Sequence, residues 1–149
     1  MKNSIPVSAL LHTKTPSVWT VPPGLTVFEA ISLMAEKNIG ALPVVSGGNL
    51  MGLFTERDYT RKIALHGRSS KQTLVAEITA CDCVTVTPET SVDECMHLMT
   101  EHRVRHLPVL HHGDLVGIIS IGDLVNWTIS SQAATIAQME QYIAGGLPA

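Results

Sequence analysis

The sequence has few aromatic residues, few charged residues and no long apolar run. Aromatic residues make up 4% and charged residues 15% of the 149 residues. A membrane-spanning helix needs about 20 consecutive apolar residues, and no segment approaches that length. The 10 basic residues are outnumbered by 13 acidic ones, which gives a formal net charge of −3. This balance excludes the broad basic surface of a general nucleic-acid binder. We therefore expect neither membrane insertion nor nucleic-acid binding.

Cysteine is also scarce, and the chain begins without a recognisable export signal. The three cysteines are an odd number, which argues against a complete disulfide framework. The first residues lack the basic segment followed by an apolar segment that marks a signal peptide. Reduced thiols are typical of the cytoplasm, so we expect a cytoplasmic protein. An apolar content of 45% is enough for an ordinary hydrophobic core at this length.

The chain contains two copies of one unit. A gapless offset of 65 residues places Val27 opposite Val92, Gly52 opposite Gly117, and the Leu-Pro-Val sequence at 42–44 opposite its repeat at 107–109. Such self-similarity indicates a duplicated structural unit. We predict units at 17–66 and 82–131, joined by a linker at 67–81. An N-terminal segment, 1–16, precedes them, and a C-terminal helical extension, 132–149, follows.

Each unit is predicted to fold as strand-helix-strand-strand-helix. Thr26 and Ser91 each precede a Glu by three residues, which is the pattern of a helix N-cap, and apolar residues then recur at helical spacing. The expected strands are 18–21, 41–45 and 50–54 in the first unit and 84–86, 106–110 and 115–119 in the second. The predicted fold class is therefore α/β (α+β), with two pseudo-symmetric β-α-β-β-α motifs packed as one module.

Two further helices are predicted outside this common pattern. A short helical turn is expected at 74–78, in the linker. The last helix of the second unit is predicted to be long, from about 121 to 144, with an apolar stripe at 3/4 spacing. The stripe consists of Val125, Ile129, Ile136, Met139 and Ile143. It is predicted either to pack on its own domain or to pack against a partner subunit.

These motifs resemble a known family of regulatory modules. The resemblance rests on residues 40–45 with 52–58 in the first unit and on residues 105–109 with 117–123 in the second. The chain is similar, from about 7 to 143, to a tandem cystathionine β-synthase (CBS) domain pair, or Bateman module, without an attached catalytic domain. The resemblance implies a disc-like, pseudo-twofold module with two clefts that can bind adenine nucleotides. It also implies a homodimer.

Two short motifs could supply the binding chemistry. Thr55-x-x-Asp58 and Ser120-x-x-Asp123 each follow an apolar strand and open a helix. The carboxylate could accept both ribose hydroxyls, and the amides at the helix N-terminus could hold phosphate. The same pattern also caps helices that bind no ligand. Both interpretations apply to each motif.

The resemblance implies two non-equivalent binding sites. The favoured site comprises Thr20, Ile39, Gly40 and Ala41 with Arg105, His106, Ser120 and Asp123. The second and weaker site comprises Thr85, Val104 and Arg105 with Thr55, Arg57, Asp58 and Arg61. Arg103 is a further candidate for phosphate contact, as is Lys62. The Asp123 site is favoured because small Gly40 and Ala41 leave room for the ligand, whereas Arg105 and His106 partly fill the matching space.

The predicted function is that of a regulatory sensor. It would bind AMP or a related ligand (ADP, ATP, NAD(H) or S-adenosylmethionine) and transmit occupancy to an unidentified protein partner. The alternative is a structural dimerisation and interaction module whose clefts bind no nucleotide. Neither a catalytic constellation nor a phosphate-binding glycine loop is present, so no enzymatic activity and no catalytic cofactor are predicted.

The cysteines suggest two weaker alternatives. Cys81 and Cys83, with His111 and His112, do not have the spacing of a common structural zinc site, so no metal is predicted. Redox sensing through Cys81 and Cys83 is a minor hypothesis. Cys95 lies on the apolar face of a predicted helix, which indicates a core residue.

Overall fold

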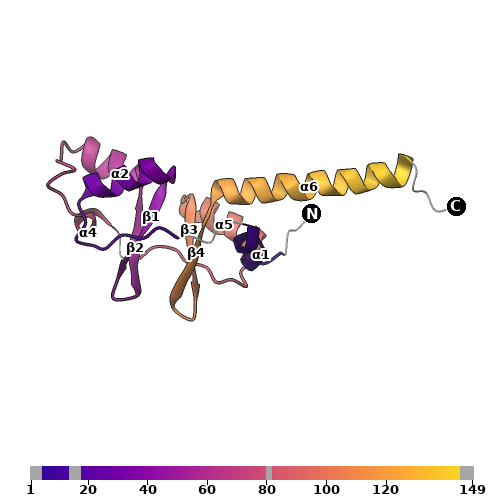
Figure 1. Cartoon of the computed structure of the whole chain (residues 1–149), viewed down its shortest axis with the longest axis horizontal. Coiled ribbons are helices and arrows are strands. Elements are labelled where there is room, and N and C mark those ends of the chain that lie inside the picture. The colour runs from indigo at the N-terminus through magenta and orange to yellow at the C-terminus, as the bar shows by residue number, and fades with distance from the viewer. Residues whose placement is uncertain (1–4, 14–17, 80–81, 145–149) are drawn as a thin grey trace.

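The protein consists of two similar α+β units followed by a long C-terminal helix (Figure 1). The structure, a computed structural model, describes residues 5–13, 18–79 and 82–144. Its elements, in chain order, are α1 (Val7–Thr13), α2 (Val27–Lys37), β1 (Ala41–Ser46), β2 (Asn49–Thr55), α3 (Glu56–Asp58), the π-helix η1 (Tyr59–Ala64), α4 (Val75–Ile78), α5 (Val92–His102), β3 (His106–His111), β4 (Asp114–Ser120) and α6 (Ile121–Ala144). The mixed fold predicted from the sequence is confirmed.

The two units repeat each other down to the irregularities of their sheets. β1 pairs antiparallel with β2 and β3 with β4, and the register shifts at Val44/Val45 and at Val109/Leu110, positions that are 65 residues apart. The predicted strands at 18–21 and 84–86 are wrong in extent. Each is reduced to one parallel bridge, Val21 with Val44 and Val86 with Val109. A proline follows each bridge within two residues, and proline cannot donate a hydrogen bond to a sheet.

The helices that follow these bridges begin where the sequence predicts. The side chains of Thr26 and Ser91 accept hydrogen bonds from the backbone N–H of Glu29 (3.2 Å) and of Glu94 (3.1 Å). An N-cap of this kind satisfies one of the amides that a helix start leaves without a partner. Both helices then end at a residue in the left-handed conformation, Asn38 or Arg103, with φ of 55° in each case.

Each unit is completed by the helix that precedes the other unit. The N–H of Val7, in α1, donates to the carbonyl of Thr90 (2.8 Å), and the N–H of Val75, in α4, donates to the carbonyl of Leu25 (2.8 Å). α1 therefore supplies Val7 and Leu10 to the core of the second unit, whereas α4 supplies Val75 and Ile78 to the core of the first. Because of this exchange, neither repeat can form its complete core from its own sequence.

α6 begins after Ser120, as predicted, but most of it extends away from both units (Figure 1). Leu124 is buried and Trp127 packs partly against the core of the second unit. Every residue from Ile129 to Gln141 is exposed. The prediction that the apolar stripe packs on its own domain is therefore wrong beyond Thr128. Across the described ranges, no helix combines the length and the hydropathy that crossing a bilayer requires.

Candidate functional site

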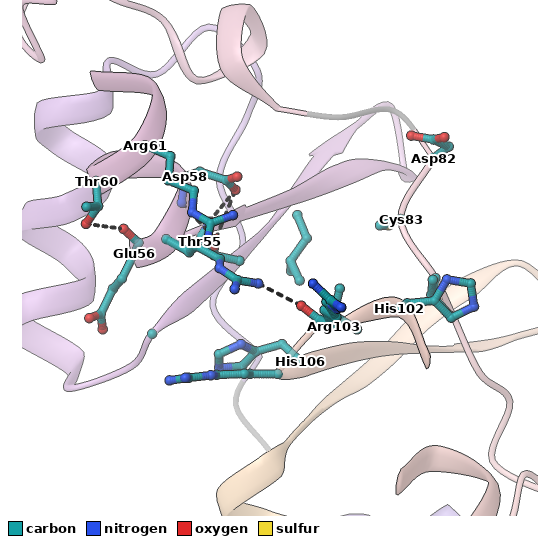
Figure 2. A pocket seen from close by; sticks show the side chains of 16 residues that line it. Thr55, Glu56, Asp58, Thr60, Arg61, Asp82, Cys83, His102, Arg103 and His106 are labelled. Carbon is teal, nitrogen blue, oxygen red and sulfur yellow. Dashed lines mark hydrogen bonds between the residues drawn. The ribbon is translucent and has the colours of Figure 1, made fainter. Parts of the chain in front are cut away.

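A cavity of about 780 Å³ lies between the two units, within the range of small-molecule sites. The first unit lines it with Gly40 and with the end of β2, α3 and η1, and the second unit lines it with 82–84 and 102–106. Figure 2 shows Thr55, Asp58 and Arg61 on the side of the first unit and Arg103 and His106 on the side of the second. The lining residues are Gly40, Leu53, Thr55, Glu56, Arg57, Asp58, Thr60, Arg61, Asp82, Cys83, Val84, His102, Arg103, Val104, Arg105 and His106.

A capping box holds the carboxylate of Asp58 in the cavity wall. Its Oδ2 accepts hydrogen bonds from the backbone N–H and from Oγ1 of Thr55, both at 3.0 Å, and Thr55 Oγ1 accepts from the N–H of Asp58 at 3.1 Å. Lys62 Nζ lies 3.4 Å from Asp58 Oδ1. The capping interpretation of this motif is therefore confirmed. Capping fixes the carboxylate at the cavity instead of turning it away, so a ligand role is compatible with it.

Four arginines line the cavity, together with three acidic residues, Glu56, Asp58 and Asp82. Arg57 and Arg61 come from the first unit, and Arg103 and Arg105 from the second. Arg57 Nη1 donates to the backbone carbonyl of Arg103 at 2.7 Å, which joins the two units across the cavity (Figure 2).

The other three guanidinium groups have no such contact. Within the described ranges, the side chains of Arg61, Arg103 and Arg105 make no hydrogen bond or ion pair, and all three residues are exposed. Unpaired guanidinium groups suit a phosphate, which they bind through charge-assisted, often bidentate hydrogen bonds.

The equivalent motif of the second unit has the same local geometry in a different setting. The backbone N–H of Ser120 donates to Asp123 Oδ2 at 2.8 Å, and the N–H of Asp123 donates to Ser120 Oγ at 3.0 Å. This pair caps α6, so its capping interpretation is confirmed as well. Neither residue is among those that line the 780 Å³ cavity.

The structure brings together part of each predicted site. Most of the second set, Val104, Arg105, Thr55, Arg57, Asp58 and Arg61, lines the cavity together with Arg103. Three members of the favoured set, Gly40, Arg105 and His106, line it too. Besides Ser120 and Asp123, four residues of the two predicted sets lie outside the lining: Thr20 and Thr85 are exposed, Ile39 is half-buried, and Ala41 is buried in the first unit.

The space that small Gly40 leaves is already occupied. A Cβ atom built on Gly40 would lie 3.2 Å from Glu56 Oε1 and 3.4 Å from the Cε1 atom of His106. Because Gly40 has no side chain, the side chains of Glu56 and His106 can approach its backbone closely. Sequence reasoning expected this room to be available to a ligand.

Sequence reasoning missed the segment 82–84 of the cavity wall. It assigned Thr85 to the second site, whereas Asp82, Cys83 and Val84 line the cavity. The signal was present, because the predicted strand 84–86 begins at this wall. Since that strand is reduced to a bridge at Val86, the residues just before it approach the cavity. Thr60 and His102 were also missed, and no sequence signal distinguished them.

Cys83 is a half-buried thiol in this wall. Burial raises its pKa, the charge of Asp82 raises it further, and a backbone hydrogen bond partly opposes both effects. A raised pKa leaves the thiol protonated and poorly nucleophilic near neutral pH, which weighs against redox sensing. Cys81, the other residue of that hypothesis, lies outside the described residues. Cys95 is a core residue, as predicted, and burial raises its pKa to about 11.

The described ranges hold no group of three or more His, Cys, Asp or Glu side chains that could coordinate a metal ion. His111 and His112 pack their rings against each other with centroids 4.1 Å apart. They lie at the tip of the β3–β4 hairpin and outside the cavity lining.

Comparison with known proteins identifies relatives over nearly the whole chain. The family model described as CBS domain matches residues 7–65 and 75–130. The CBS domain-containing protein YhcV of Bacillus subtilis is 38% identical over 128 residues, which cover 86% of this chain and 91% of that protein. The mitochondrial CBS domain-containing protein CBSX3 of Arabidopsis thaliana is 44% identical over 126 residues. This match covers 81% of this chain but only 61% of the longer plant protein.

Solved structures of similar proteins share the fold. A protein with CBS domains from Burkholderia ambifaria superimposes with a TM-score of 0.82 at 52% identity, covering 85% of this chain and 96% of that one. A hexameric CBS-CP12 protein from bloom-forming cyanobacteria superimposes with a TM-score of 0.74 at 33% identity. That match covers 82% of this chain and 67% of the cyanobacterial chain.

Proposed function

Because the chain belongs to the CBS domain family, a family of regulatory modules, we propose that it senses an adenine nucleotide. The nucleotide would be AMP or a related ligand (ADP, ATP, NAD(H) or S-adenosylmethionine) that occupies the cavity between the two units. The observation that carries the proposal is the pairing of a fixed carboxylate, Asp58, with four arginines in one cavity. A nucleotide presents the complementary groups, since it has a ribose diol and at least one phosphate, and S-adenosylmethionine offers the same diol with a carboxylate in place of the phosphate.

Each part of a nucleotide has a suitable partner in the cavity. The ribose hydroxyls donate hydrogen bonds to Asp58, whose carboxylate the capping box already orients. The phosphate lies among Arg61, Arg103 and Arg105, whose guanidinium groups have no other described partner. The adenine packs on the aliphatic lining of the cavity, formed by Leu53, Val84 and Val104. Among the described residues no Phe, Tyr or Trp lines the cavity, so aliphatic side chains and backbone groups hold the base, with the imidazole rings of His102 and His106 nearby.

The ligand signals because it touches both units. A bound nucleotide stabilises the relative arrangement of the units in which Asp58 of one and the Arg103–Arg105 segment of the other contact it together. The strength of the signal equals the difference in affinity between that arrangement and the others. The receiver is an unidentified protein partner, and the active form is a homodimer, in keeping with the oligomeric assembly reported for the CBS-CP12 protein. The odd number of cysteines favours a reducing, cytoplasmic location.

Differential scanning fluorimetry with AMP, ADP, ATP, NAD and S-adenosylmethionine tests this function. A ligand at 100 times its dissociation constant stabilises the native state by about 2.7 kcal/mol, which gives a clear rise in the midpoint temperature. We expect at least one of these ligands to produce that rise in the wild-type protein and to lose it in the Asp58→Asn variant. A lack of any shift at millimolar concentration would instead support the structural and interaction module. A shift lost in Asp123→Asn but kept in Asp58→Asn would support the Asp123 site.

A further inference from the structure

An apolar stripe runs along α6 and continues through its outer part, and every member is exposed in the described structure. The exposed fractions are 46% for Val125, 59% for Ile129, 55% for Ile136, 59% for Met139 and 71% for Ile143. Figure 1 shows this part of the helix projecting beyond both units. Five large apolar side chains in one row are far more than the scattered apolar residues of an ordinary surface.

The sequence of this segment gives an isolated helix little support. Helices of about 12–15 residues are marginal in water without tertiary contacts, even when they are rich in alanine, and the part of α6 beyond Thr128 is only slightly longer. The segment contains Ser130, Ser131 and Thr135, which are poor helix formers, and α6 has no basic residue that could pair with Glu140. Packing against a partner would therefore stabilise this part of the helix further.

The spacing of the stripe identifies the partner as another helix of the same kind. Ile129, Ile136 and Ile143 recur every seven residues, and Val125 and Met139 occupy the second position of the same heptads. A β-branched residue at the first position is typical of parallel two-stranded coiled coils, which usually carry leucine at the second position, where this chain has Val125, Gln132 and Met139. We propose that α6 of one chain pairs with α6 of a second copy as a parallel, two-stranded coiled coil.

One polar residue in the stripe selects the parallel orientation. Gln132 occupies the heptad position shared by Val125 and Met139. In a parallel, in-register pair it faces the same residue of the second copy, and the two amides hydrogen-bond to each other. In an antiparallel pair centred on the stripe it faces Ile136 of the second copy, which leaves a buried amide without a partner. A single polar residue at such a position specifies register and orientation.

The size and charge of the stripe fit a second copy. Covering the exposed parts of these side chains on both helices removes on the order of 1,000 Å² from water, near the lower bound for specific interfaces. The whole of α6 carries two charged residues, Asp123 and Glu140. A charged peptide or an anionic membrane would therefore find no complementary charge on it, whereas a self-complementary apolar row suits an identical helix.

Substitutions on the two sides of the helix test the pairing. Ile136→Glu places a charge in the seam, whereas Gln138→Glu places the same charge on the outer face, two residues away. By multi-angle light scattering over a concentration series, the wild type and Gln138→Glu should have twice the 16.0 kDa mass of one chain. Ile136→Glu should weaken association at least a hundredfold and elute as a monomer. A monomeric wild type, or a dimer that survives Ile136→Glu, would overturn the proposal.

Cysteine crosslinking tests the orientation. In a chain that carries Cys81→Ser and Cys83→Ser, a Met139→Cys substitution should form an intermolecular disulfide rapidly, since a parallel pair brings these positions together. An antiparallel pair would hold them about 15 Å apart along the axis, beyond the reach of a disulfide. Gln141→Cys, on the outer face, is the matched control and should crosslink slowly. A dimer in which Met139→Cys crosslinks no faster than Gln141→Cys would exclude the parallel arrangement. Neither experiment depends on nucleotide binding.

Discussion

The two units of this protein have the same backbone but differ in where they carry positive charge. Their hairpins share register and bulge, their first helices share caps and left-handed ends, and each accepts a helix from the segment before the other. The two units differ where these strands begin. Gly40 and Ala41 stand at the start of β1, whereas Arg105 and His106 stand at the same positions at the start of β3.

The helix that follows each hairpin differs in the opposite sense. Arg57 and Arg61 of the first unit correspond to Gly122 and Asn126 of the second. The cavity combines the basic helix of the first unit with the basic segment of the second, so all four arginines gather in one place. The opposite combination pairs the start of α6, which contains Asp123, with the segment that contains Gly40. None of the four arginines lies in either of these two segments. Duplication thus kept the backbone, while a few surface substitutions made the two clefts chemically different.

The largest effect is expected where the two units are least independent. Leu10 in α1 and Ile78 in α4 occupy equivalent positions. Leu10 completes the core of the second unit, and Ile78 completes that of the first. We consider the substitutions Leu10→Ala and Ile78→Ala. Each substitution should lower the free energy of unfolding by about 2–5 kcal/mol, as measured by urea denaturation. Leu65→Ala, at a residue that is 77% exposed, should change it by less than about 0.5 kcal/mol. A separate transition for one unit would show that the repeats do not depend on each other.

Nucleotide affinity should separate the two capped carboxylates. Asp58→Asn and Asp123→Asn both keep a side-chain oxygen that can accept from the backbone N–H of Thr55 or Ser120, but each removes a negative charge. Hydrogen bonds to charged groups contribute about 1.5–3 kcal/mol, so Asp58→Asn should weaken binding about tenfold to a hundredfold by isothermal titration calorimetry. Asp123→Asn should leave the dissociation constant within about threefold. The reverse order would move the nucleotide to the other cleft.

A smaller effect is expected for the phosphate-binding arginines. Arg61→Gln should weaken nucleotide binding about fivefold to tenfold and reduce its dependence on salt, because an exposed charge acts through a screened field. Arg68→Gln is the matched control. Arg68 lies outside the cavity and pairs with Glu77 at 2.9 Å. Equal losses for the two variants would show that only the overall charge of the protein matters.

The fold could be predicted from the sequence because each element of the repeated unit is indicated independently by two copies of the same pattern. The hairpins and the helix starts after Thr26 and Ser91 follow from patterns that are local and present in both copies. The length of α6 follows from its own apolar spacing, which the first copy lacks. What failed was the extent of the strands at 18–21 and 84–86. Within the described ranges they pair only with Val44 and Val109, and the prolines that limit the pairing lie just beyond Val21 and Val86.

The choice between the two clefts depended on side-chain positions that no repeat pattern contains. The space beside Gly40 is filled by Glu56 and His106, a contact between residues far apart in the sequence. The charge difference was readable in principle, since the same offset that reveals the repeat also aligns Arg61 with Asn126. Only the folded chain shows what occupies the room beside Gly40, and the choice between the two clefts stays a prediction.

The smallest effect concerns two thiols, one in the cavity wall and one in the core. The pKa values of Cys83 and Cys95 are both raised, that of Cys95 to about 11. A raised pKa lowers the thiolate fraction below that of a free cysteine, so both thiols should react slowly with iodoacetamide at pH 8. In a Cys81→Ser chain, peptide mass spectrometry should show Cys83 reacting faster than Cys95, with both rates rising as the pH rises. Saturating nucleotide should slow Cys83 severalfold and leave Cys95 unchanged. An unprotected Cys83 would mean that the ligand binds elsewhere, because this thiol lines the same cavity as Asp58 and Arg61.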